Sequence, residues 1–214
     1  SGTRGSGTIF FTGCSLRCAF CQNSEISGES LHGKDFTVEE FIETIKKLEA
    51  MGAHNINLVT PTHFASQIAE ALRIYKPRVP VVYNCGGYES VETLRMLEGL
   101  VDIYLPDFKY LNTDHAKKYS MAEDYPEVAK AALAEMVRQA GKPVFDERGM
   151  MKRGVIVRHL LLPGCLADGK RVVKYLHETY GNRIYMSLMS QYTPLESLDA
   201  AKYPELNRKV PEYA

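Results

Sequence analysis

Strand-like apolar runs alternate with helix-like patterns along most of this chain, and that alternation limits its possible folds more than any other feature. Six runs have the length and composition of buried strands. We expect them at residues 8–12, 56–60, 79–83, 101–105, 155–162 and 184–188. Because helical patterns separate consecutive runs, the order predicts a parallel sheet with helices packed outside it.

Capping residues locate several of the helices. Thr37 and Glu40 form a capping box ahead of apolar residues at helical spacing, and Asp168 is predicted to cap a later helix. Residues 145–153 are polar and broken by glycine, which indicates a loop or short hairpin. Prolines interrupt the chain after position 194, so we expect no long helix there.

The size and charge of the chain favour one ordinary globular domain covering residues 1–214. It has 214 residues, with 26 Lys plus Arg against 26 Asp plus Glu. No net field therefore recruits nucleic acid or an anionic membrane, and we expect neither as a partner. Right-handed crossovers allow a doubly wound open sheet or an incomplete barrel, and periodicity alone does not choose between them.

Targeting signals are missing from the sequence as given. No apolar run is long enough to cross a bilayer, and residues 1–6 are rich in glycine and serine without an apolar signal core. We therefore expect a cytoplasmic protein. A reducing compartment also suits the five cysteines, because clustered thiols there indicate metal or redox chemistry.

Three of the cysteines, Cys14, Cys18 and Cys21, share one loop directly after the first predicted strand. Their C-x3-C-x2-C spacing suits iron or zinc, but a structural zinc site usually has four protein ligands. The other two cysteines lie far away in sequence, so an iron–sulfur cluster here would keep one iron without a protein ligand. The alternatives are a zinc site completed by His32 or His54, and three unrelated thiols.

The spacing of the loop, its place after a strand, and Phe20 before the last cysteine resemble the signature of the radical S-adenosylmethionine (SAM) superfamily. The resemblance implies a partial (β/α)6 barrel with a 4Fe–4S cluster on the three cysteines. It also implies that SAM chelates the open iron through its amino and carboxylate groups. One-electron reduction then yields methionine and a 5′-deoxyadenosyl radical that abstracts a hydrogen atom.

Within that superfamily, residues 7–194 are similar to the pyruvate formate-lyase activating enzyme group. The segments that carry the likeness are 5–11, 21–23, 58–64, 106–110 and 158–164. The likeness implies a flavodoxin or ferredoxin as reductant, and a glycine α-carbon of a partner glycyl radical enzyme as substrate. A small molecule or another peptide site is the alternative substrate.

Three strand ends depart from the pattern of the activating-enzyme group. A Gly-Gly-Glu segment that contacts the methionine amine in that group corresponds to residues 60–62, where Thr60 carbonyl and Thr62 hydroxyl oxygens can accept hydrogen bonds. The alternative is a simple turn in which Thr62 caps a helix. Asn84 stands where the group has Asp and can bond the ribose hydroxyls or a cofactor carboxylate. Gln191 stands where the group has His and can contact the adenosine.

Charged residues follow one of the buried strands and lie within another. Asp107 and Lys109 point the same way because they are two positions apart. The resemblance implies that Lys109 pairs with the methionine carboxylate and that Asp107 lies near it, often with a monovalent cation. A plain ion pair at the rim is the alternative. Arg158, among apolar neighbours, needs an acceptor such as that carboxylate or the cluster loop. His159 faces the opposite way and should pack under a helix.

Overall fold

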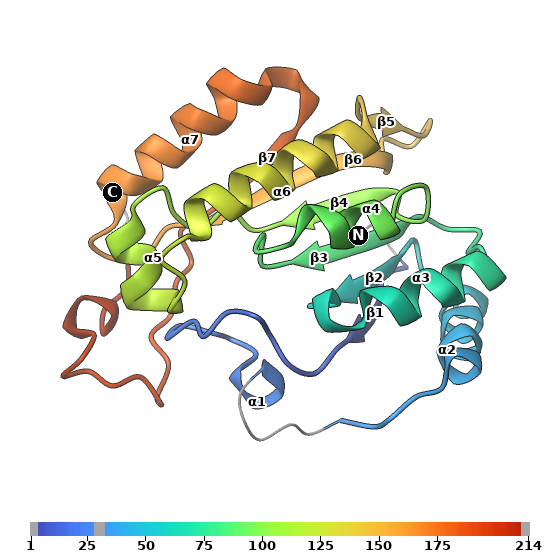
Figure 1. Ribbon diagram of the computed structural model, residues 1–214, viewed down its shortest axis with the longest axis horizontal. Helices are drawn as coiled ribbons and strands as arrows, with labels where there is room; N and C mark the ends of the chain where they lie inside the picture. The colour runs from blue at the N-terminus through green and yellow to red at the C-terminus, as the bar shows by residue number, and fades with distance from the viewer. Residues whose placement is uncertain (1–3, 28–32, 211–214) are drawn as a thin grey trace.

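The computed structural model describes residues 4–27 and 33–210, and it has the parallel α/β architecture that the alternation predicts (Figure 1). Six parallel strands lie in the order β1-β2-β3-β4-β6-β7. A two-residue strand, β5, pairs antiparallel with the start of β6. The strands are β1 Gly7–Phe10, β2 Ile56–Val59, β3 Val81–Cys85, β4 Ile103–Pro106, β5 Val144–Phe145, β6 Met151–Leu160 and β7 Tyr185–Met189.

Helices cover the outer side of the strands, and the cysteine loop lies at one end of them beside α5 (Figure 1). The predicted capping box is present at the start of the second helix: the Thr37 side chain accepts from Glu40 N–H, and the Glu40 side chain accepts from Thr37 N–H. The helices are α1 Ser24–Ser27, α2 Val38–Ala50, α3 Ala65–Ile74, α4 Val91–Met96, α5 Thr113–Ser120, α6 Tyr125–Ala140 and α7 Leu166–Tyr180. Short 3-10 helices occupy Thr62–Phe64, Gly181–Arg183 and Pro204–Leu206.

The sheet is a partial barrel with an open flank. Among the described strands, β1 pairs only with β2 and β7 pairs only with β6, so the first and last parallel strands do not close on each other. All six parallel strands end at the same edge, where chemistry collects in such folds. An isolated bridge between Asp107 and Arg158 extends the β4–β6 pairing to that edge.

Most sequence-based expectations of the fold are confirmed, with one correction. Residues 145–153 form the β5–β6 hairpin, and after Pro194 the described chain has only the 3-10 helix Pro204–Leu206. Asp168 was expected to cap α7, but Cys165 is the N-cap residue. Asp168 lies in the first turn of the helix, and its buried carboxylate accepts from the Leu111 and Asn112 amides. No helix in the described ranges is long and apolar enough to cross a membrane.

Candidate functional site

A cavity of about 530 Å³ lies at the carboxyl ends of the strands, inside the partial barrel. Ten of the eleven site residues predicted from the sequence line it, and they come from the cysteine loop and from the ends of five strands. They are Cys14, Cys18, Phe20, Cys21, Thr60, Asn84, Asp107, Lys109, Arg158 and Gln191. Thr62 is the exception and is not among the residues that line the cavity.

The cysteine loop is fixed by backbone hydrogen bonds to two other segments. Gly13 N–H donates to Ile26 O at 2.8 Å. On either side of Cys18, Arg17 N–H donates to Ser120 O at 3.2 Å and Ala19 N–H donates to Tyr119 O at 2.8 Å. The loop is therefore docked on the last turn of α5, about a hundred residues away in sequence.

Each of the three thiols has a hydrogen-bond partner. Leu16 N–H lies 3.5 Å from Cys14 Sγ, Ser120 Oγ lies 3.0 Å from Cys18 Sγ, and Ser27 Oγ lies 3.1 Å from Cys21 Sγ. Such partners orient the sulfur atoms of a metal-ligating loop.

Cys14 and Cys18 lack the lowered thiol pKa of a nucleophilic cysteine. Burial raises the pKa of the Cys14 and Cys18 thiols above its usual value. A nucleophilic cysteine needs the opposite shift. Thiols of this kind release their protons to solvent when a metal binds and displaces them.

Three thiols in one loop suit a 4Fe–4S cluster, in which the fourth iron would have no protein ligand. In the part of the chain that the structure describes, no three His, Cys, Asp or Glu side chains approach as closely as the ligands of one ion do. In a 4Fe–4S cluster each thiolate binds a different iron, so its ligands can be farther apart. His54 precedes β2, at the opposite end of the sheet from the loop. His32 lies outside the described residues.

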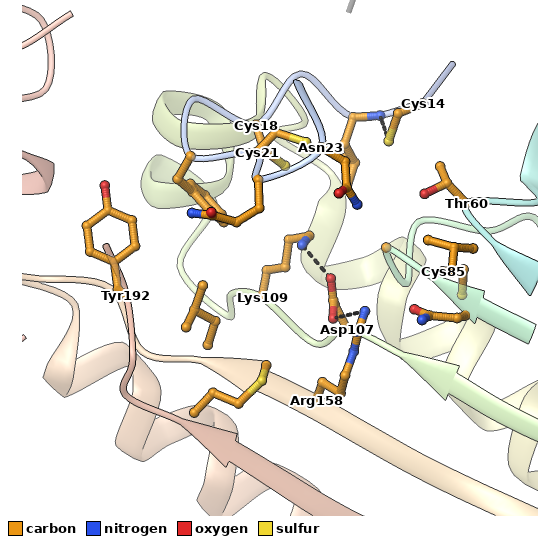
Figure 2. A pocket seen from close by; sticks show the side chains of 18 of the residues that line it. Cys14, Cys18, Cys21, Asn23, Thr60, Cys85, Asp107, Lys109, Arg158 and Tyr192 are labelled. Atoms are coloured by element: carbon orange, nitrogen blue, oxygen red, sulfur yellow. Dashed lines mark hydrogen bonds and ion pairs between the residues drawn. The ribbon is translucent and has the colours of Figure 1, made fainter. Parts of the chain in front are cut away.

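Three charged side chains form the centre of the cavity, and Figure 2 shows Lys109 and Arg158 on opposite sides of Asp107. Lys109 Nζ donates to Asp107 Oδ2 at 2.6 Å, and Arg158 Nη2 donates to Asp107 Oδ1 at 2.8 Å. The three side chains are only 16–29% exposed. One carboxylate between two cations leaves this charged trio, Asp107, Lys109 and Arg158, with a net charge of +1.

The trio keeps its charges despite partial burial. Burial alone would raise the pKa of Asp107, but the charges of Lys109 and Arg158 hold it below its usual value. Burial works against the Lys109 ammonium as well, but Asp107 and Cys18 raise its pKa overall. Both Asp107 oxygens are already bonded to cations, so the monovalent cation expected there would have to displace one of them. That cation stays a prediction.

A strained turn follows β2. Thr60 has φ +56°, a left-handed conformation that is costly for a β-branched residue. Its N–H donates to Asn84 O at 2.8 Å, which ties the turn to β3. Strain of this kind occurs often at binding sites, and Thr60 lines the cavity.

The hydroxyl of Thr62 does not have the capping role considered from the sequence. It caps no helix, since α3 begins after Phe64 without a side-chain cap. It donates to Glu89 Oε1 at 2.7 Å, and Tyr83 OH donates to Glu89 Oε2 at 3.0 Å. Glu89 is 2% exposed, and burial raises its pKa to about 7. This bond occupies the proton of the Thr62 hydroxyl and leaves its oxygen able to accept, so the cofactor contact expected of Thr62 stays a prediction.

The remaining predicted residues surround the trio. Asn84 is buried at the end of β3, and Gln191 is exposed two residues beyond β7. Phe20 is 6% exposed, and Lys109 Nζ lies 5.6 Å from the centre of its ring. His159 faces away from the cavity, as expected, and its Nδ1 lies 2.8 Å from Phe108 O.

Sequence reasoning missed three residues that bear on this site. Asn57 on β2 faces the cavity two positions before Val59, and its buried Oδ1 has no described hydrogen-bond partner. Strand alternation could have singled out this polar side chain. No sequence signal pointed to Ser120 or Glu89, because each reaches the site through a tertiary contact.

Comparisons with known proteins agree with this geometry. The family model of the radical SAM superfamily matches residues 8–164. An uncharacterized protein of Methanocaldococcus jannaschii is 29% identical over 96% of this chain, which spans 58% of that protein's length.

Two solved structures share the fold. HydG, a maturase of the [FeFe]-hydrogenase, has TM-score 0.58 and 16% identity over 94% of this chain and 46% of its own. Streptococcus suis SuiB has TM-score 0.56 and 13% identity over 94% of this chain and 44% of its own. Another structure of SuiB, bound to precursor peptide SuiA, also has TM-score 0.56, with 9% identity over 95% of this chain and 42% of that one.

Proposed function

This chain belongs to the radical SAM superfamily, whose cofactors are a 4Fe–4S cluster and S-adenosylmethionine, and from that membership we propose that it abstracts hydrogen from a polypeptide substrate. In this proposal Cys14, Cys18 and Cys21 hold three irons of the cluster. When bound, the cluster supplies the electron that cleaves SAM into methionine and a 5′-deoxyadenosyl radical. The protein's own residues bind, orient and shield that cofactor.

The charged trio supports the SAM-binding part of this proposal, because it places two cations beside the cysteines where a carboxylate could bind. Its net charge of +1 is balanced by one carboxylate ligand, and Lys109 and Arg158 are the donors that such a ligand needs. Asp107 fixes both cations in place before the ligand binds, which reduces the entropy lost on binding. We assign this position to the methionine carboxylate of SAM.

The other contacts follow from the position of each side chain around the trio. The strained Thr60 turn offers a carbonyl oxygen and a hydroxyl to the methionine amine. Asn84 offers its amide to the ribose hydroxyls, and Gln191 offers its amide to the adenosine. Phe20 covers Lys109 and keeps water from that part of the cavity.

A polypeptide substrate is supported by the open flank. Phe10, on the unpaired edge of β1, lines the cavity and is 54% exposed. Across the opening, Met189 and Leu160 give the cavity an apolar wall. An opening with apolar edges suits an extended chain segment, and SuiB, which shares the fold, binds a precursor peptide. The likeness to activating enzymes narrows the proposed target to a glycine α-carbon of a glycyl radical enzyme.

Deuterium transfer tests the substrate class. The reconstituted protein is given SAM, a flavodoxin or dithionite as reductant, and a glycyl radical enzyme that contains α-dideuterated glycine. The proposal predicts deuterium in 5′-deoxyadenosine and a protein-centred radical by electron paramagnetic resonance, which is a doublet with ordinary glycine and collapses to a singlet with the dideuterated glycine. If 5′-deoxyadenosine forms without deuterium and without that radical signal, the glycine target is wrong, although the cleavage activity stands.

A further inference from the structure

We propose that Ser120 and Tyr110 form a hydrogen-bond relay to Cys18 that raises the reduction potential of the cluster. The inference rests on the proposed assignment of Cys14, Cys18 and Cys21 as cluster ligands. It assigns a tuning role to two residues that are not ligands themselves.

The relay consists of two short contacts in the protein interior. Ser120 Oγ lies 3.0 Å from Cys18 Sγ, and Tyr110 OH lies 2.9 Å from Ser120 Oγ. Ser120 and Tyr110 are each 1% exposed. Because water does not reach either hydroxyl, no solvent hydrogen bond competes with the relay, and each bond is stronger than it would be at the surface.

The direction of the relay follows from the chemistry of a metal-bound thiolate. A thiolate has no proton, so Ser120 O–H must donate to Cys18 Sγ. The serine oxygen is then free to accept from Tyr110 O–H. Burial raises the pKa of Tyr110 well above its usual value, so this phenol keeps its proton and remains the donor at the start of the relay.

The backbone holds the serine against the sulfur. The amides of Arg17 and Ala19, on either side of Cys18, both donate to carbonyls at the end of α5. Met121, immediately after Ser120, has φ +54° and ends the helix at that point. The serine hydroxyl and the thiol therefore belong to two segments that are clamped together, and the contact does not depend on one flexible side chain.

The effect on the potential has a definite sign. Reduction adds negative charge to the cluster, and a hydrogen bond to a ligating sulfur stabilises the more negative state. The relay therefore makes the cluster easier to reduce. The Lys109 ammonium acts on Cys18 in the same direction, since its charge favours the thiolate over the thiol.

A redox titration of the reconstituted holoprotein tests the relay. We expect Ser120→Ala to keep its iron and to have a more negative midpoint potential. At a fixed solution potential, the ratio of reduced to oxidised cluster should fall up to about tenfold, which corresponds to about 59 mV for one electron. Tyr110→Phe should shift the midpoint potential in the same direction by a smaller amount. Ser120→Thr, which keeps a hydroxyl, should have the wild-type potential. Ser24→Ala, an exposed site on α1, is the control and should change nothing.

Different outcomes would overturn the relay and the ligand assignment. If Ser120→Ala and Tyr110→Phe both hold a full cluster at the wild-type potential, the relay is wrong and the contact is only structural. If Ser120→Ala loses the cluster, Tyr110→Phe alone decides, because it removes one hydroxyl without touching the serine. A Cys18→Ala protein that retains a full cluster would instead overturn the ligand assignment.

Discussion

Arg158 Nη2 lies 2.8 Å from Asp107 Oδ1, so the partly buried arginine of β6 is joined to the first residue after β4. The opposite carboxylate oxygen bonds Lys109 at 2.6 Å. These two bonds make Asp107 the centre of the site. They also explain how an arginine on an otherwise apolar strand is tolerated, since a partly buried charge needs a partner.

Replacing Lys109 with alanine should weaken SAM binding without removing the cluster. A charge-assisted hydrogen bond contributes about 1.5–3 kcal/mol, which corresponds to a Kd roughly ten- to a hundredfold higher. Calorimetry on the reconstituted protein measures the affinity, and iron analysis checks the cluster. Lys174→Ala, on the exposed side of α7, is the matched control. An unchanged Kd for Lys109→Ala would refute the carboxylate site.

Asp107→Asn should destabilise the fold, because it leaves two cations close together in a poorly hydrated place. Removing one partner of a buried ion pair costs about 3–5 kcal/mol, and the partial exposure here points to the lower end of that range. Chemical denaturation measures the change. Glu127→Gln, which breaks a surface pair with Lys130, should cost no more than about 1 kcal/mol. Equal effects in the two variants would contradict this account.

Glu89 should make stability fall as the pH rises from about 4.5 to about 7. Burial raises its folded-state pKa to about 7, while an unfolded glutamate titrates near 4.3. Between those values the folded state holds more protons than the unfolded state, so the free energy of unfolding decreases with pH and levels off above 7. The full change is of order 3 kcal/mol.

Glu89→Gln should lack this pH dependence. The quantity to follow is the difference in free energy of unfolding between the wild-type protein and Glu89→Gln at each pH. Burial lowers the pKa of His159, which makes stability rise with pH over a neighbouring range and partly masks the Glu89 effect. Urea denaturation at several pH values supplies both curves. Parallel curves for the two proteins would mean that Glu89 is already ionised near pH 5.

The backbone strain at Thr60 predicts an unusual order of stabilities. A left-handed residue with a Cβ atom costs about 1–2 kcal/mol, which glycine avoids. Thr60→Gly should therefore be more stable than Thr60→Ala by about 1 kcal/mol, although alanine is normally the more stabilising residue. Denaturant midpoints of the two variants test this, and the reverse order would show that the turn is not strained.

Much of the site could be predicted because parallel strands bring their carboxyl ends together. Thr60, Asn84, Asp107 and Arg158 end four different strands, so alternation alone placed them near one another and near the loop after β1. The open partial barrel came from a family resemblance, because periodicity does not separate it from a doubly wound sheet.

The contacts between distant segments could not be predicted. Ser120 meets Cys18 only because α5 docks on the cysteine loop, and Glu89 supports the Thr60 turn from the loop after β3. Asp168 had the local pattern of a helix cap, but its carboxylate bonds amides more than fifty residues away. In each case the deciding hydrogen bond forms only in the folded chain, and for Asp168 it overrides the local preference for a cap.

Anaerobic reconstitution followed by a cleavage assay tests the central claim most directly. We predict about four irons and four sulfides per chain, and 5′-deoxyadenosine formed from SAM with dithionite. Cys18→Ala should lose cluster and cleavage together, whereas Lys109→Ala should keep the cluster and need far more SAM. A protein that binds zinc stably, takes up no iron–sulfur cluster and forms no 5′-deoxyadenosine would contradict this account.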